Sequence, residues 1–159
     1  MSSLSRQFPF GKKLLHHQDN RAIVFIDAKF PGCNTIVQQV VPEARVIIVN
    51  SQADGIKEIT RILNSSSCEE VYLIGYGSPG CLRFGNSELS INTLIQYERE
   101  LQSWFGNFSA QNHDSPRLYL HGCNVASGDV GDEFITKLKR MTGAIITASA
   151  RVNNCHAIN

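Results

Sequence analysis

The chain has 159 residues, of which 42% are apolar and 18% charged, a composition that predicts one soluble globular domain. Fifteen Lys and Arg residues against fourteen Asp and Glu residues leave a net charge of +1. Nucleic acids and anionic membrane surfaces attract proteins largely through positive charge, so this near balance predicts no nucleic-acid partner. The longest apolar runs, such as residues 22–26, are too short to span a bilayer, and no membrane insertion is expected.

The pattern along the chain predicts one α/β domain with irregular ends. Residues 1–20 are polar, have no hydrophobic period and contain no apolar stretch of signal-peptide length, so we expect an irregular N-terminal arm without a secretory signal. Residues 21–150 alternate short apolar runs with amphipathic segments, and we expect them to form the domain. Residues 151–159 are predicted to be a polar tail.

Short runs rich in β-branched residues predict strands over residues 22–27, 44–49, 70–74, 117–120 and 144–148. Apolar residues at helical spacing predict helices over residues 34–41, 54–63, 91–104 and 130–141, with a hairpin at 81–84 and 87–89. Asp54 is a suitable helix cap, and Gly143 is suited to end the last helix. Strands that alternate with helices indicate an α/β sandwich, with a mainly parallel sheet and helices on both faces.

Cysteine usage argues against a metal or disulfide framework. The chain has five cysteines, without Cys-x-x-Cys spacing: Cys33, Cys68, Cys81, Cys123 and Cys155. An odd and scattered set is not typical of a disulfide scaffold, and a zinc ribbon would need paired ligands. No metal or other cofactor is therefore expected.

In parallel sheets the functional residues lie just beyond the carboxyl ends of the strands, which directs attention to the loops after Ile26, Ile74 and Leu120. The loop at residues 75–80 has the glycine spacing of a dinucleotide-binding motif. That motif requires a helix whose first amides hold the pyrophosphate. Here a proline lies inside the loop and a hairpin follows, so nucleotide binding is not expected.

Cys123 is the candidate nucleophile. It follows an apolar strand and lies close to the start of a predicted helix, where amide dipoles favour the thiolate. The neighbouring Gly122 allows close approach of the backbone. The alternative is that Cys123 is a small buried hydrophobic residue without chemistry, which is common for a lone cysteine.

Several short runs give the chain a family resemblance: Ile23–Asp27, Gly77–Gly80 with Leu82, Gly85 and Leu89, Leu120 with Gly122–Ala126, and Thr142–Ala144. With these motifs the chain resembles the bacterial domain of unknown function 4347 over most of its length, residues 23–148. That family is similar to caspase-like cysteine peptidases, which include gingipains, metacaspases and caspases. The resemblance therefore implies a caspase-like three-layer sandwich.

The same resemblance implies roles for residues at two strand ends. In the peptidases a His-Gly after the third strand and a Cys after the fourth form a catalytic dyad, and two backbone amides form the oxyanion hole. Here the nucleophile position is Cys123, and the oxyanion donors would be the amides of Gly77 and Cys123. Where the family usually has Ser-His-Gly, this chain has Gly75-Tyr76-Gly77, so Tyr76 stands at the position of the missing histidine.

A missing general base predicts a degenerate site. A phenol, with its ordinary pKa near 10, is protonated at pH 7, so a tyrosine is a poor base there. We therefore expect a pseudo-peptidase or recognition module that binds a peptide or protein segment. The alternative is an active cysteine peptidase or self-processing domain that uses Cys123 with His121 or another base.

Two further residues have alternative interpretations. His121 lies two residues before Cys123, on the same face of an extended strand, and could replace the base, line a substrate pocket or simply pack. Asp27 could bind a basic side chain of the substrate, as the relatives do, or cap the turn after its strand. The family domain commonly lies in long secreted or surface proteins, so the resemblance implies a surface assembly. The sequence indicates no oligomeric state.

Overall fold

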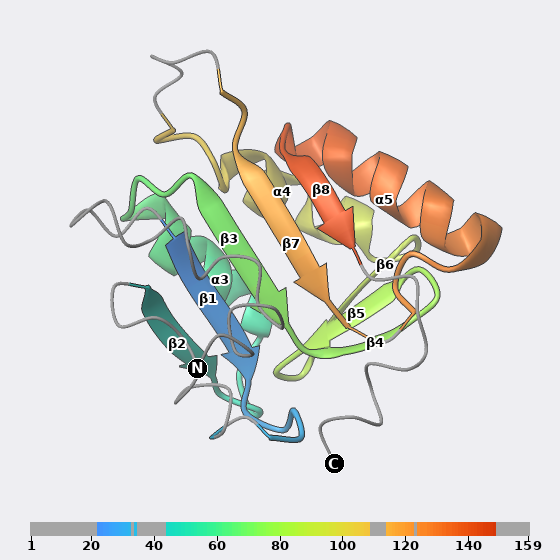
Figure 1. The fold of residues 1–159 in the computed structure, drawn as a ribbon, viewed down its shortest axis with the longest axis horizontal. Helices are drawn as coiled ribbons and strands as arrows, with labels where there is room; N and C mark the ends of the chain where they lie inside the picture. The colour runs from blue at the N-terminus through green and yellow to red at the C-terminus, as the bar shows by residue number, and fades with distance from the viewer. Residues whose placement is uncertain (1–21, 33, 35–43, 109–113, 123, 149–159) are drawn as a thin grey trace, which may run out of the picture.

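The computed structural model describes residues 22–32, 34, 44–108, 114–122 and 124–148. Its centre is a five-stranded sheet in the order β2-β1-β3-β7-β8, in which every pair of neighbouring strands is parallel (Figure 1). The strands are β1 (Ala22–Asp27), β2 (Arg45–Val49), β3 (Glu70–Ile74), β7 (Arg117–His121) and β8 (Ile145–Ala148). Each agrees with its predicted range to within one residue.

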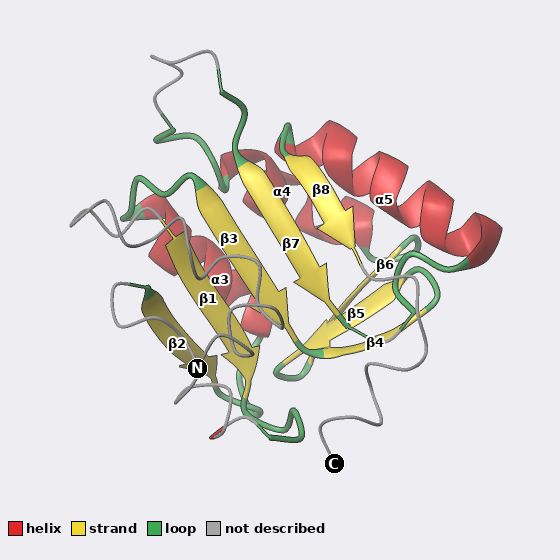
Figure 2. Cartoon of the chain, viewed as in Figure 1, coloured by secondary structure: helices red, strands yellow, loops and turns green. Residues whose placement is uncertain are grey.

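The described helices cover one face of this sheet (Figure 2). They are α3 (Gly55–Asn64), α4 (Glu98–Ser103) and α5 (Gly128–Thr142). Their apolar residues pack with alternate strand residues, such as Phe25, Leu73 and Leu120, in the main hydrophobic core. Burial of these side chains is the main favourable contribution to folding.

The opposite face of the sheet is buried over its two central strands, β1 and β3. Val24, Ile26, Tyr72 and Ile74 form a second cluster with almost no exposed surface. Strands that are buried on both faces have continuous apolar sequences, which is why the runs were recognisable. The predicted α/β three-layer sandwich with a mainly parallel sheet is confirmed. The helix predicted at residues 34–41 falls almost wholly outside the described residues.

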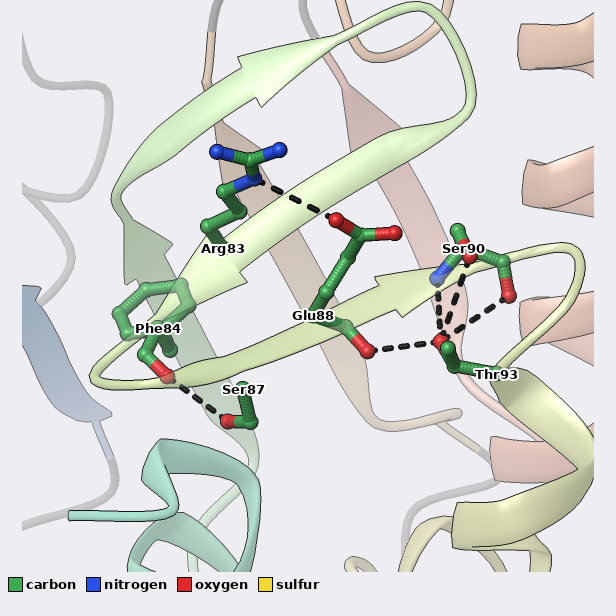
Figure 3. A network of polar contacts seen from close by, with 6 residues as sticks. All are labelled: Arg83, Phe84, Ser87, Glu88, Ser90 and Thr93. Carbon is green, nitrogen blue, oxygen red and sulfur yellow. Dashed lines mark hydrogen bonds and ion pairs between the residues drawn. The ribbon is translucent and has the colours of Figure 1, made fainter.

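A second, antiparallel sheet follows β3 in the chain. It has the strand order β4 (Tyr76–Ser78), β5 (Cys81–Phe84) and β6 (Ser87–Ser90). The predicted hairpin of β5 and β6 is confirmed, and an ion pair joins Arg83 to Glu88 across it at 3.3 Å (Figure 3). Strand β4 was not predicted, because three residues around a glycine carry no alternating pattern. Pro79 and Gly80 form the tight turn to β5, with the positive φ of Gly80 (69°) expected in a type II turn.

The helix predicted over residues 91–104 is confirmed only in its last part, and its first part is wrong. The chain makes a turn, then the 3₁₀ helix η2 (Leu94–Tyr97), and only then the short helix α4. Thr93 explains the difference, because its hydroxyl accepts from the Ser90 amide at 2.8 Å and donates to the Glu88 carbonyl at 2.6 Å (Figure 3). Side chains that bond the nearby backbone in this way compete with the start of a helix.

The other described helices begin and end much as predicted. The Asp54 carboxylate accepts from the amides of Ile56 and Lys57, both at 3.1 Å, and caps α3. Helix α5 begins at Gly128, two residues earlier than predicted. It ends at Gly143, whose φ of 72° is the left-handed conformation that glycine accepts readily at this position.

Candidate functional site

Two neighbouring parallel strands, β3 and β7, end side by side. Ile74 lies opposite His121 in the register of the two strands, and the Gly75 amide donates to the His121 carbonyl at 3.2 Å. The chain that continues to Tyr76 and the chain that continues past Gly122 therefore leave the sheet at the same edge. Cys123, the predicted nucleophile position, lies outside the described residues.

Glycines allow the small sheet to pack directly on these strand ends. A Cβ atom on Gly122 would lie 2.7 Å from Leu82 Cδ1 and 3.3 Å from the Gly75 carbonyl oxygen. A Cβ atom on Gly75 would lie 2.6 Å from the carbonyl oxygen of Arg83. The close approach predicted at Gly122 is thus made to β5 and to Gly75, and larger side chains would push the layers apart.

Tyr76 is directed toward the end of β1. Its hydroxyl donates to the Lys29 carbonyl at 2.7 Å, and its ring packs against Phe30 with 5.9 Å between centroids. The strand order puts β1 and β7 on opposite sides of β3, so this hydroxyl is bonded on the side away from β7. The side chain is 41% exposed.

Asp27 is a buried carboxylate with both oxygens occupied. One oxygen accepts from the Lys29 amide and the other from the Gly85 amide, each at 2.7 Å, and the residue is only 2% exposed. Gly85 has a φ of 61°, and a Cβ there would lie 2.2 Å from the Ala53 carbonyl oxygen. These contacts are those of the capping interpretation, and they also join β1 to the turn between β5 and β6. The substrate-binding interpretation of Asp27 stays a prediction.

His121 is the last residue of β7 and is partly buried. Burial lowers the pKa of its imidazole below the ordinary value of 6.5, because a charged ring would lose hydration. The ring is therefore neutral at pH 7. A neutral imidazole is the form that can accept a proton, so the protonation state suits a base.

An open hollow of about 590 Å³ lies beside Tyr76, within the size range of small-molecule sites. It is lined by Asp27, Lys29, Tyr76, Gly77, Ser78, Cys81, Arg83 and Gly85. Tyr76, Gly77 and Asp27, which the sequence singled out, are brought together here, and His121 is not among the lining residues.

Five lining residues were missed as functional candidates: Lys29, Ser78, Cys81, Arg83 and Gly85. For two of them, the alternation along β5 was the available signal. Leu82 and Phe84 are buried, whereas Cys81 and Arg83, which alternate with them, face outward. Burial raises the pKa of the Cys81 thiol, and the nearby Glu88 carboxylate raises it further. This thiol therefore stays protonated at neutral pH.

No group of three or more His, Cys, Asp and Glu side chains in the described part of the chain is arranged to hold a metal ion. Within the same residues, no helix combines the length and apolar character that crossing a bilayer requires. A search of curated proteins found no match to the chain. The model of one family, described as "Domain of unknown function (DUF4347)", matches residues 23–154. Because the match spans most of the sequence, the chain belongs to the family of domain of unknown function 4347.

Proposed function

We propose that the edge where β3 and β7 end is a degenerate cysteine-peptidase-like site in a caspase-like domain, and that it binds a peptide or protein segment. Cys123 is the nucleophile position, and Tyr76 stands where the base would be. The observation that carries this proposal is the pairing of β3 with β7, in which Ile74 and His121 lie opposite each other. The family membership supports it.

Proton transfer is the step that this site performs poorly. When a thiol attacks a peptide carbonyl, a C–S bond forms, and the S–H proton must pass to a base and then to the leaving amine. The Tyr76 hydroxyl donates a hydrogen bond to the Lys29 carbonyl, so in this contact it is a donor and does not act as a base. Loss of a general acid–base group typically costs about 10²- to 10⁴-fold in rate. Binding is therefore the main activity in our proposal.

The pairing of β4 supports Gly77 as an oxyanion donor. Hydrogen-bonded and non-hydrogen-bonded pairs alternate along an antiparallel ladder. Ser78 and Cys81 flank the two-residue turn, and Gly77 pairs with Leu82 one step further. Because the residues that flank such a turn exchange hydrogen bonds, the next pair does not. The Gly77 amide is then directed away from β5, toward the open edge of β4.

The hollow beside Tyr76 supports a polar peptide as the occupant. Its lining includes two cations, Lys29 and Arg83. Arg83 is joined to Glu88 through Nε, which leaves its two terminal amino groups directed elsewhere (Figure 3). The lining carboxylate, Asp27, accepts from two backbone amides. In this proposal Asp27 shapes the hollow, and the two cations favour an acidic side chain of the bound segment.

One observation favours a second candidate function, an active cysteine peptidase or self-processing domain. The lowered pKa of His121 provides a neutral imidazole two residues before Cys123. If this ring took the thiol proton, the resulting imidazolium would stabilise the thiolate and lower the pKa of the thiol.

The pH dependence of Cys123 alkylation discriminates between the two functions. For the degenerate site we expect a midpoint near the free thiol value of about 8.5, unchanged in His121→Ala. For a working Cys–His pair the midpoint is lower, and His121→Ala moves it back toward about 8.5. Iodoacetamide labelling, followed by mass spectrometry of the Cys123 peptide across the pH range, measures both profiles. Cys123→Ala supplies the background, and a profile that shifts in His121→Ala contradicts the degenerate site.

A further inference from the structure

The outward face of the small sheet carries a row of three polar side chains. Strand pairing puts Tyr76 opposite Arg83 and Arg83 opposite Glu88, so β4, β5 and β6 each contribute one residue to the row. Residues directly opposite each other in an antiparallel sheet have side chains on the same face, with about 5 Å between Cβ atoms. The neighbouring pair, Leu82 and Leu89, is fully buried. The row therefore faces away from the core.

Arg83 lies in the middle of this row and is held on one side. Its Nε atom forms the ion pair with Glu88 Oε2 at 3.3 Å, and Figure 3 shows both terminal amino groups beyond Nε, away from that carboxylate. On the other side of the row Tyr76 lines the hollow, as does Arg83 itself. The terminal amino groups carry four of the five N–H donors of an arginine. They are the part of Arg83 that a ligand in the hollow can use.

The charges of the hollow suit an acidic group. Its two cations, Lys29 and Arg83, are both exposed. Its carboxylate, Asp27, is 2% exposed and accepts from two backbone amides, each at 2.7 Å, so hydrogen bonds within the protein already compensate its charge. The charge that a ligand meets in the hollow is therefore mainly positive.

We propose that Arg83, oriented by Glu88, determines the specificity of the hollow for an acidic side chain of the bound segment. This inference rests on the proposed function and deepens it by naming the residue that recognises the charge, and Cys123 has no part in it. A guanidinium presents two parallel N–H donors that match two oxygens of a carboxylate or phosphate. Lys29 adds positive charge without that geometry. Glu88 is a positioning residue, because it acts through Arg83.

Binding of three short peptides to the full chain tests this inference. The probes are Ac-Ala-Asp-Ala-NH2, its neutral isostere Ac-Ala-Asn-Ala-NH2, and the same peptide with phosphoserine at the central position. Two-dimensional ¹H–¹⁵N NMR spectra at increasing peptide concentration give the dissociation constants. The signals followed are the backbone amides of Gly77 and Ser78 and the Nε–H of Arg83, so the measurement needs no reaction at a cysteine.

For the natural chain we expect the aspartate peptide to bind about tenfold more tightly than the asparagine peptide, because its contact with Arg83 is charge-assisted. Tighter binding of the phosphoserine peptide than of the aspartate peptide would identify phosphate as the preferred acidic group, and weaker binding would identify carboxylate. Arg83→Lys keeps the charge and loses the paired donors, so its preference should fall to about threefold or less. Arg140→Lys, at an exposed arginine on α5, is the matched control and should keep the tenfold preference.

Variants of Glu88 separate positioning from charge compensation. In Glu88→Gln the amide oxygen can still accept from Arg83 Nε, so the preference for aspartate should be retained. Glu88→Ala removes the partner, and the preference should fall to about threefold, as in Arg83→Lys. If Glu88 only compensated the charge of Arg83, both variants would raise the preference, because a negative charge near the ligand is removed. That result would contradict the positioning role.

Two further results overturn the inference. Either the natural chain binds the aspartate and asparagine peptides equally, or Arg83→Lys prefers aspartate as strongly as the natural chain does. In both cases peptides still bind, and the proposed function stands. Failure of the proposed function gives a different result, in which none of the three peptides shifts these signals, and it removes the inference as well. The Arg83 and Glu88 side chains are 68% and 39% exposed, so unfolding midpoints of the variants should match the natural chain.

Discussion

Replacing Tyr76 by His is expected to raise the Cys123-dependent hydrolysis of peptide esters by about 100-fold or more, the usual effect of a general acid–base group. The Tyr76 hydroxyl contacts the Lys29 carbonyl on the side away from β7. An imidazole ring is shorter than a phenol and would not reach that carbonyl, so it is released from this contact. Turned toward the end of β7, its neutral form can take the thiol proton and return it to the leaving group. Initial rates at pH 7 measure the change.

Two variants control this prediction. Tyr76→Phe removes the hydroxyl and supplies no base, so its rate should stay at the natural level. The double variant with Tyr76→His and Cys123→Ala should lose the gain, because the nucleophile is absent. A gain that appears in Tyr76→Phe, or that persists without Cys123, would contradict the assignment of position 76 to the base.

Replacing Asp27 by Ala is expected to lower the free energy of unfolding by about 3 kcal/mol, since hydrogen bonds to charged groups contribute about 1.5–3 kcal/mol each. The carboxylate accepts from the amides of Lys29 and Gly85, each at 2.7 Å, and is 2% exposed. Alanine would leave two amides without their acceptor. Urea denaturation monitored by circular dichroism measures the loss.

Asp132→Ala, at an exposed carboxylate on α5, is the matched control and should stay close to the natural stability. Asp27→Asn should fall between the natural chain and Asp27→Ala, because the amide keeps one acceptor oxygen. Unchanged stability of Asp27→Ala together with weaker peptide binding would contradict the capping role and favour the substrate-binding interpretation.

The sheet was predictable because its signal is local and strong. Strand β1 is buried along its whole length, so its sequence from Ala22 to Ile26 is continuously apolar. Caps were predictable for the same reason. Asp54 bonds amides two and three residues ahead, and Gly143 needs only its own left-handed backbone.

The remaining features depend on contacts between residues far apart in sequence. The Tyr76 hydroxyl donates a hydrogen bond to the Lys29 carbonyl, 47 residues away in the sequence. The Asp27 carboxylate accepts one from the Gly85 amide, 58 residues away. No local period encodes such pairs, so the orientation of Tyr76 and the bond from the Gly85 amide to Asp27 could not be predicted. The bond from the Lys29 amide to Asp27 is local, and it is the one that the capping interpretation predicted. The absent start of the 91–104 helix is a different case. Thr93 was visible in the sequence, but its bonds to Ser90 and Glu88 depend on the strand that precedes it.

For the candidate site, the sequence predicted which strand ends lie together. The sequence and the family resemblance indicated that the chain segments after β3 and β7 meet at one edge, and the pairing of Ile74 with His121 confirms that these two strand ends are neighbours. The hollow could not be predicted, because it forms between the end of β1 and the small sheet. Its two cations come from segments that have no pattern in common.

Native thiol mapping tests the central proposal, that Cys123 faces an accessible site at the end of β7, most directly. Cys68 is an internal reference, because it is 3% exposed and burial raises the pKa of its thiol to about 11. Brief alkylation of the folded chain at pH 8, followed by mass spectrometry, should modify Cys123 and leave Cys68 unmodified until urea unfolds the protein. Protection of Cys123 to the same extent as Cys68 would contradict the account.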